Sequence, residues 1–400
     1  MAILSNRIRK VAASQTSQMT DIARKMQAAG RDIISLAAGE PDFDTPKSIR
    51  DAAITAIEAG KTRYTAVDGI SELKDAIIAK FARDNQLHYT HEEISVATGG
   101  KQILFNALMA TINPGDEVII PSPYWVSYPE MIRIAGGIPK TVNTESNGFK
   151  ITPEDLNDAI GENTKWVIMN SPANPTGAVY SWYELRRLTE VLLEHPHVWV
   201  LTDDIYEPII YDDVEFHTVA EVEPLLKQQT LTCNGCSKAY AMTGWRIGYA
   251  GGPKELIAAM RKIQSQSTSN PSSISQWAAV AALTGPQEII QENNQVFQQR
   301  RDLIVSMLNT TNLLSCNVPD GAFYAYSSLH KVIGMTTPDG VKIVNDSVFA
   351  NKLLEDTGVA VVCGAAFGTS PYFRVSFAAS QSELEIACTR IQDFCQTLSD

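Results

Sequence analysis

The sequence is short of cysteine and of positive charge, and both shortages restrict what the protein can be. It has 6 Cys in 400 residues, which is too few for a disulfide-stabilised scaffold. Its 33 Lys and Arg against 45 Asp and Glu give a net charge of −12, and no run of Lys and Arg is longer than two residues. A protein that binds nucleic acid needs a concentrated cationic surface. We therefore expect no nucleic-acid partner.

Long apolar runs are also missing. No stretch approaches the roughly 18 consecutive apolar residues of a membrane-spanning helix, and the N-terminus lacks the apolar core and cleavage site of a secretory signal. We therefore expect a cytoplasmic protein with reduced cysteines and no membrane partner. Cys233 and Cys236 have the spacing of a metal or redox pair, but no second pair or His cluster accompanies them. We expect no metal.

An alternation of helical and strand patterns between about residues 46 and 260 favours a parallel sheet covered by helices. In its first helix, Thr45 and Pro46 are typical of an N-cap and a first helical residue, and Gly60 of a stop. One face of this helix carries the apolar residues Ile49, Ala53, Ala56 and Ile57.

Strands are indicated by runs of β-branched residues. They are expected at Ile94–Thr98, Glu117–Pro121, Trp166–Met169, Val198–Thr202 and Leu231–Cys233. Turn-forming residues follow each run, and open α/β sheets bind ligands outside these strand ends.

From about residue 285 the pattern changes to a long polar helix, short strands and a last amphipathic helix. These elements are expected at Gln287–Leu308, Ala322–Tyr326, Gly358–Val362, Phe373–Ser376 and Ser382–Thr397. We predict an α/β fold with a large domain over 46–284, containing the mostly parallel sheet, and a smaller α+β domain from 1–45 and 285–400.

Two nucleotide-binding motifs are incomplete. Gly60, Lys61 and Thr62 imitate the end of a P-loop, but Thr55 stands where that motif needs glycine. No G-x-G-x-x-G follows an expected strand either, so nothing local supports an NTPase or a hydride-transfer enzyme.

The most informative segment is GCSKAYAMTGWRIG, residues 235–248. Lys238 stands among small and apolar residues, which lower the pKa of an amine toward the range of Schiff-base chemistry, and Arg246 supplies a planar guanidinium suited to a phosphate. The segment resembles the lysine motif of the class I and II aminotransferases, enzymes of pyridoxal-phosphate fold type I. The resemblance implies pyridoxal 5'-phosphate as cofactor, bonded to Lys238 beside Ser237, with its phosphate on Arg246.

Two further motifs occur in the family's chain order. The turn NSPANPTG, residues 170–177, resembles the family's NPxG turn, which implies that Asn174 bonds the phenolic oxygen of the cofactor. DDIYE, residues 203–207, resembles the family's D-[DE]-x-Y motif. It implies that Asp203 keeps the pyridine nitrogen protonated, which strengthens the ring as an electron sink, and that Tyr206 bonds the phenolic oxygen. Lys238, Asp203 and Tyr206 are the expected catalytic residues.

A Gly-Gly pair stands between an expected strand and a helix. Glycines let the backbone approach a ligand closely, and the free N–H groups of a helix start can bind phosphate. Within the family this turn holds the cofactor phosphate, so the resemblance assigns Gly99, Gly100 and the adjoining Lys101 to cofactor binding. Trp125 matches the aromatic residue that stacks on the cofactor ring.

Other matches concern the substrate. Arg374, in YFRVS at 372–376, corresponds to the arginine that binds the α-carboxylate as a bidentate fork. Gly39 matches the N-terminal segment that closes over the substrate. Tyr64 matches the tyrosine that reaches the cofactor phosphate of the neighbouring subunit, and Asn270 is a second candidate for that contact. The resemblance therefore implies a homodimer with shared active sites.

Within the family the sequence looks closest to the subgroup Iβ bacterial aspartate aminotransferases. These use a lysine after the Gly-Gly pair, with Ser or Thr near the N-terminus, for the substrate's second carboxylate, and Lys101, Ser14 and Thr16 fit. Trp125 and Asn174 are expected to line the same pocket. Lys101 is also compatible with an ordinary surface lysine in the first turn of a helix.

The resemblance implies transfer of the amino group of L-aspartate to 2-oxoglutarate by a ping-pong mechanism. An aminotransferase of different preference, for prephenate, alanine or an aromatic amino acid, is the main alternative, because only the side-chain pocket would differ. A lyase or decarboxylase on the same fold is a further alternative. A cofactor-sensing transcription regulator would need a basic helix-turn-helix, for which we expect no room.

Overall fold

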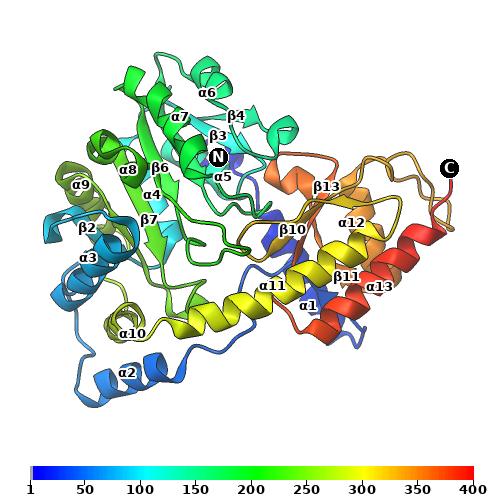
Figure 1. The fold of residues 1–400 in the computed structure, drawn as a ribbon, viewed down its shortest axis with the longest axis horizontal. Helices are drawn as coiled ribbons and strands as arrows, with labels where there is room; N and C mark the ends of the chain where they lie inside the picture. Colours follow the sequence, from blue (N-terminus) through cyan, green and yellow to red (C-terminus); the bar gives the residue numbers. More distant parts are fainter. Residues whose placement is uncertain (1–2) are drawn as a thin grey trace.

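The computed structural model describes residues 3–400, and a seven-stranded sheet forms its centre (Figure 1). In spatial order the strands are β2 (Ile94–Ala97), β8 (Gly248–Gly251), β7 (Thr230–Gly235), β6 (Trp199–Asp203), β5 (Thr164–Asn170), β3 (Glu117–Ser122) and β4 (Ile138–Asn143). Only β8 runs against its neighbours. The predicted mostly parallel sheet is confirmed.

Helices cover both faces of this sheet. They are α3 (Ser71–Asn85), α4 (Gly100–Thr111), α5 (Tyr128–Ala135), α6 (Pro153–Ala159), α7 (Trp182–Glu194), α8 (Val219–Val222), α9 (Lys254–Ser265) and α10 (Ser273–Thr284), while α2 (Lys47–Glu58) packs on α10. In β5, Trp166 and Ile168 pack with α4, α5 and α9, whereas Val167 and Met169 pack with α6, α7 and α8. This period of two explains why the strand reads as a continuous apolar run, since both of its faces are buried.

The pairing register brings the functional strand ends together. Asn170 at the end of β5 lies opposite Asp203 at the end of β6, and Asp203 lies opposite Cys233 in β7. Because these strands are parallel, the turns after β5, β6 and β7 lie at one edge of the sheet.

A second part of the molecule holds a four-stranded antiparallel sheet. Its strands, in spatial order, are β12 (Val362–Cys363), β13 (Tyr372–Ser376), β10 (Tyr324–Ser328) and β9 (Ser315–Cys316), and β1 (Ile34–Ser35) pairs separately with β11 (Val359–Ala360). The helices here are α1 (Gln15–Ala28), α11 (Glu288–Asn309), α12 (Asp346–Thr357) and α13 (Gln381–Thr397). The long helix α11 connects the two parts and ends beside α13 (Figure 1).

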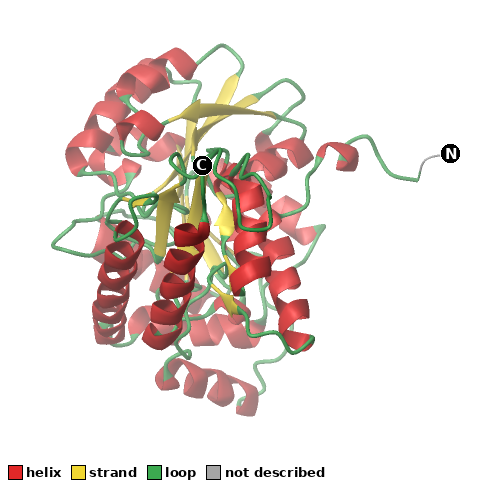
Figure 2. Ribbon diagram, turned by 90° about the vertical axis from the view of Figure 1, so that its right-hand side faces the viewer, coloured by secondary structure: helices red, strands yellow, loops and turns green. Residues whose placement is uncertain are grey.

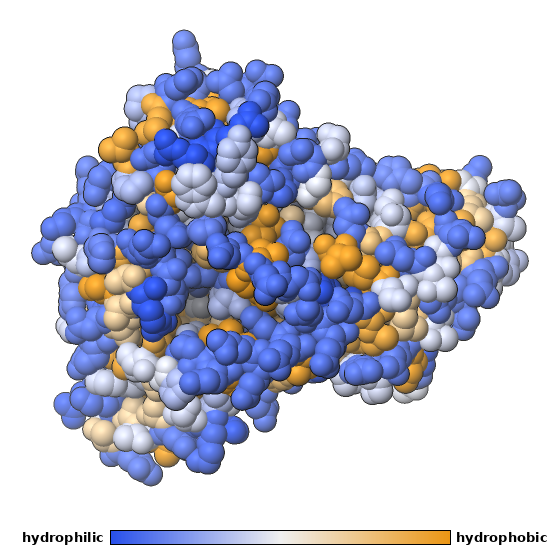
Figure 3. All heavy atoms as spheres, in the orientation of Figure 1, coloured by the Kyte–Doolittle hydropathy of each residue, from blue (hydrophilic) through white to orange (hydrophobic). Residues whose placement is uncertain are grey.

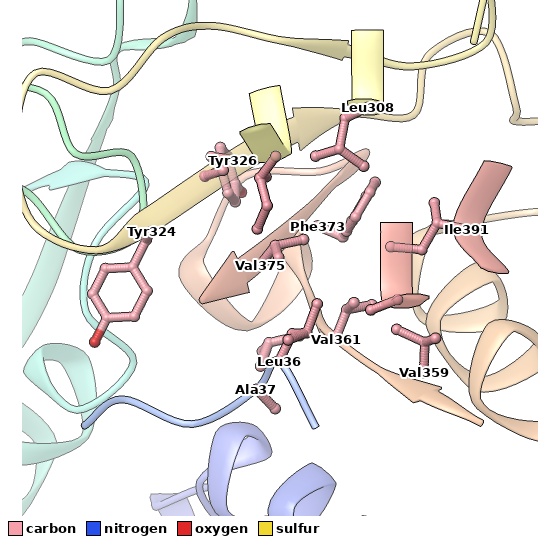
Figure 4. Packing of buried hydrophobic residues seen from close by; sticks show 14 of the residues in the cluster. Leu36, Ala37, Leu308, Tyr324, Tyr326, Val359, Val361, Phe373, Val375 and Ile391 are labelled. Carbon is pink, nitrogen blue, oxygen red and sulfur yellow. The ribbon is translucent and has the colours of Figure 1, made fainter. Parts of the chain in front are cut away.

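The two ends of the chain share one hydrophobic core. Leu36, from the N-terminal segment, is buried with Val361, Phe373 and Ile391, and these side chains converge in Figure 4. This core agrees with a small domain built from both termini, while the boundaries at 46 and 285 stay a prediction. Residues 3–10, ahead of α1, extend away from the body of the molecule (Figure 2).

The expected start of the first helix is wrong by one residue. Pro46 is the N-cap and the helix begins at Lys47, because the Thr45 hydroxyl instead donates to the Ala241 carbonyl oxygen at 2.6 Å. Ile49, Ala53 and Ala56 are buried as expected, but Ile57 is 52% exposed. At about 100° per residue, Ile57 lies beside the buried stripe.

Several strand predictions also need correction. The strand expected from Ala322 begins at Tyr324, because Ala322 has a φ of 56°, which no β-strand accommodates. The run at 358–362 forms two short strands, β11 and β12, in different sheets. The polar strand β4 and the Gly-rich strand β8 were not predicted, since neither has a β-branched apolar run. Among residues 3–400, no helix combines the length and apolar character that crossing a bilayer requires.

Candidate active site

A cavity of about 500 Å³ lies where the turns after β5, β6 and β7 face the four-stranded sheet and α1. Its wall includes most of the residues that the sequence singles out. These are Thr16, Gly39, Gly100, Lys101, Trp125, Asn174, Asp203, Tyr206, Ser237, Lys238, Arg246 and Arg374. Side chains from both parts of the molecule therefore meet in one place.

Lys238 follows β7 and presents its amine to this cavity. The Nζ donates a hydrogen bond to the carbonyl oxygen of Gly39. Burial lowers the pKa of Lys238 to about 8; the Glu40 carboxylate opposes this shift and the Arg246 guanidinium adds to it. At neutral pH a larger fraction of this amine is therefore unprotonated and nucleophilic than for an ordinary lysine.

Asp203 ends β6 and is buried beneath the cavity. Burial raises the pKa of Asp203 to about 6, although the Tyr128 hydroxyl, which donates to its Oδ2 at 2.7 Å, acts in the opposite direction. A cation beside Asp203 would restore the ionised carboxylate.

Tyr206 lies three residues after Asp203, in the turn that follows β6. Its hydroxyl is 2.8 Å from the Tyr324 hydroxyl in β10, and both side chains are buried. Burial holds the pKa of Tyr206 well above its usual value. The phenol therefore stays protonated and can donate a hydrogen bond.

Arg374 is in β13, an interior strand of the four-stranded sheet, and is only 2% exposed. Its Nη1 donates to Asn174 Oδ1 and its Nη2 to the Ala37 carbonyl oxygen, each at 2.8 Å. Its Nε is buried and has no hydrogen-bond partner. Among residues 3–400 no carboxylate pairs with this guanidinium, which leaves its positive charge suited to a ligand carboxylate.

The Gly-Gly turn forms a tight cradle at the start of α4. Gly99 has a φ of 87°, and a Cβ there would overlap the Arg246 guanidinium. Gly248 in β8 packs so closely on Gly99 and Gly100 that it also has no room for a side chain. The arrangement places a guanidinium beside the N–H groups of a helix start, which suits a phosphate.

Lys101 and α1 border the cavity on another side. Lys101 Nζ is 4.7 Å from the centroid of the Trp125 ring, and burial lowers the pKa of Lys101. Thr16 contributes to the wall, but Ser14 does not: it caps α1, and its Oγ is 2.9 Å from Thr16 Oγ1. The structure therefore gives Ser14 a supporting position.

Tyr64 and Asn270 lie outside this cavity. The Tyr64 side chain is 92% exposed, and Asn270 Nδ2 donates to the Pro271 carbonyl oxygen. Both placements are compatible with contacts to another subunit.

Some wall residues were not predicted. Tyr128 and Tyr324 belong to an apolar helix turn and an apolar strand, where aromatic residues ordinarily indicate core packing. Asp21 and Arg24 line the cavity from α1; the signal that could have found them is their spacing from Thr16 on one helical face. Cys233 and Cys236 are buried free thiols, and no cluster of three or more potential metal ligands occurs in the part of the chain that the structure describes.

The fold and this site define an α/β enzyme in which a lysine, a carboxylate and two arginines line one cavity. The family described as aminotransferase class I and II matches residues 31–391. The chain therefore belongs to the class I and II aminotransferases, as predicted.

Similar proteins cover the whole chain. It is 59% identical over 400 residues to the aspartate/prephenate aminotransferase of Cereibacter sphaeroides, with all of both chains covered. The crystal structure of the aspartate aminotransferase of Rhizobium meliloti superposes with a TM-score of 0.97 at 54% identity, over 100% of both chains. The Thermus thermophilus aspartate aminotransferase with maleate has a TM-score of 0.91 at 42% identity, over 98% of this chain and 100% of that one.

Proposed function

We propose that the chain transfers the amino group of L-aspartate to 2-oxoglutarate, forming oxaloacetate and L-glutamate, with pyridoxal 5'-phosphate as its cofactor. The observation that carries this proposal is the Lys238 amine in one cavity with Asp203, Arg246 and Arg374. The names of the similar proteins from Cereibacter sphaeroides and Rhizobium meliloti support the choice of aspartate.

The residues present fit this cofactor. The Gly99 turn beside Arg246 leaves no room for a Cβ and suits the phosphate. Asp203 would hold the ring nitrogen protonated, and Trp125 would cover a ring face. When bound, the cofactor supplies an electron sink for the electron pair released at the substrate Cα.

The side chains of the site have separate roles in this reaction. The Lys238 amine would hold the cofactor through its aldehyde, and as a free amine it would remove the proton from the substrate Cα and return it, as general base and acid. Asn174 and Tyr206 would donate hydrogen bonds to the phenolic oxygen. Ser237 would support the phosphate beside Arg246.

The substrate's two carboxylates are assigned to opposite walls. Arg374, which lines the cavity, binds the α-carboxylate through its guanidinium as a bidentate fork. Lys101 binds the second carboxylate, with Thr16 beside it and Ser14 behind Thr16. Gly39 belongs to the segment that covers the bound substrate.

We also propose a homodimer. Tyr64 lies outside its own chain's cavity, and Ile54 and Ile57 on α2 are half exposed. Ile3 is 99% exposed in the segment that extends from the body. In a dimer these apolar groups would be covered, and Tyr64 would reach the partner's phosphate site.

A second substrate is favoured by one specific observation. The protein from Cereibacter sphaeroides is named for prephenate as well as aspartate, and prephenate also carries a second carboxylate that Lys101 could bind. A panel of aspartate, glutamate, alanine, phenylalanine and prephenate, followed by cofactor absorbance in half-reactions, tests both assignments. Aspartate turning over no faster than alanine would refute the main one.

A further inference from the structure

Behind the Lys238 loop, the structure contains a buried polar network whose members the mechanism above does not use. Glu207 follows Tyr206 directly, and its carboxylate accepts from Lys80 Nζ at 2.5 Å and from Asn85 Nδ2 at 2.9 Å. Asn234 Nδ2 in β7 donates to the same carboxylate. Glu207 and Lys80 are each only 6% exposed.

The network connects the two segments that bear the proposed catalytic residues. Asn234 Oδ1 accepts from the Gly235 N–H at 2.7 Å, so the Asn234 side chain holds the last residue of β7, three positions before Lys238. On the other side, the Glu207 N–H donates to the Asp204 carbonyl oxygen at 2.9 Å. Glu207 is therefore fixed to the Asp203–Tyr206 segment by its backbone and to the lysine segment by its side chain.

Stability alone does not explain the buried ion pair between Lys80 and Glu207. Removing two charges from water offsets much of their attraction, and well-packed apolar groups are often as stable. Here the carboxylate accepts three donors from α3 and β7. An apolar pair of the same volume could not align these donors. The contribution of the ion pair is therefore the alignment of α3 with β7.

A second cavity adjoins the network. It measures about 380 Å³, and Lys80, Glu207, Asn234 and Tyr240 contribute to its wall. The face of the molecule drawn in Figure 3 is hollowed left of its centre. Gly235 and Ala239 of the lysine loop line the second cavity too, so the network and the loop share its wall.

We propose that Glu207, held by Lys80, is a positioning residue that fixes the end of β7 through Asn234 and so sets the place of Lys238 relative to Tyr206 and Asp203. Its effect on turnover rests on the proposed function, in which Lys238 is the reacting amine. Its effect on the amine itself does not depend on the cofactor.

Two variants test the proposal. Glu207→Gln removes the charge that orders the three donors, and Asn234→Ala removes the link to β7 while leaving the contact between Lys80 and Glu207 intact. Both should lower kcat for the aspartate half-reaction by up to about 100-fold, with little change in KM. A misplacement of about 1 Å of a reacting group can cost this much. If Glu207→Gln does not fold, Asn234→Ala carries the test alone.

The second readout uses the cofactor-free protein. The pH dependence of Lys238 acetylation by acetic anhydride, followed by peptide mass spectrometry, reports how far the amine is shielded from water. In both variants the midpoint should rise by about one pH unit toward that of an ordinary lysine, as water enters. A merely structural role would leave this midpoint in place.

Lys74→Met is the matched control. Lys74 is also buried on α3, but its amine pairs with Asp68 at 2.7 Å and donates to the His91 carbonyl oxygen, outside the Glu207 network. The control should lower the melting temperature and leave the Lys238 midpoint unchanged. Wild-type kcat and midpoint in folded Asn234→Ala, or an equal midpoint shift in Lys74→Met, would overturn the proposal. Turnover that survived Lys238→Ala would instead refute the proposed function.

Discussion

The side-chain amide of Asn170 donates to the main-chain oxygen of Asp203 at 2.6 Å, and its Oδ1 accepts from the Asn174 N–H at 2.8 Å. One side chain at the end of β5 thus joins the neighbouring strand to the turn that carries Asn174. Asn174 in turn accepts from Arg374 in the four-stranded sheet. Two sheets are connected through the residues proposed to hold cofactor and substrate.

Replacing Lys238 by alanine should abolish nearly all turnover and leave cofactor binding, which would become noncovalent. The reason is that the amine both bonds the cofactor and moves the Cα proton. Borohydride reduction followed by peptide mapping should label Lys238 in the wild type and nothing in the variant. A variant with wild-type rates would contradict the assignment.

Arg374→Lys should lower kcat/KM about 100-fold for aspartate and glutamate alike, because a single ammonium cannot hold Asn174, Ala37 and a carboxylate in one plane. Half-reaction kinetics measure the loss, and cofactor affinity in the same variant is the control. Alanine should lose as much, and a loss confined to the two dicarboxylic substrates would place Arg374 at the second carboxylate instead.

Gly99→Ala should weaken cofactor binding by at least about tenfold, since the added methyl group would displace the Arg246 guanidinium and a hydrogen bond to a charged group is worth about 1.5 to 3 kcal/mol. Gly115→Ala is the matched control: its φ is 101°, but nothing lies within 4 Å of the added carbon. Equal cofactor affinity in the two variants would show that the cradle is not the phosphate site.

Much of this arrangement was predictable, for reasons that differ between residues. Lys238, Asp203 and Asn174 stand at strand ends, where sequence motif and strand register agree. Tyr128 could not be found in this way, because its hydroxyl acquires a function only when α5 folds against β6. Arg374 was expected in a short strand, but its central place in the sheet depends on pairings between distant segments.

The pH dependence of stability should reveal the burial of Asp203. Its folded pKa of about 6 exceeds the ordinary 3.8, so its contribution to stability is present below pH 4 and is lost as the pH rises through 6. The loss should be of the order of 3 kcal/mol in the cofactor-free protein. Urea unfolding at pH 4.5 and pH 7 should therefore show a larger gain of stability in Asp203→Asn over the wild type at pH 7. A pH-independent difference would mean that Asp203 is not buried as described.

Lys101→Ser should separate substrates by their charge. Aspartate and glutamate should lose far more kcat/KM than alanine or phenylalanine, because only dicarboxylates present a second anion to the Nζ beside Trp125. Removing a charge-assisted hydrogen bond of about 2 kcal/mol predicts roughly a 30-fold selective loss. Prephenate in the same panel extends the test: if it loses as much as aspartate, both substrates place their second carboxylate on this lysine. Equal losses for every amino acid would remove Lys101 from recognition and leave it a phosphate-side or surface residue.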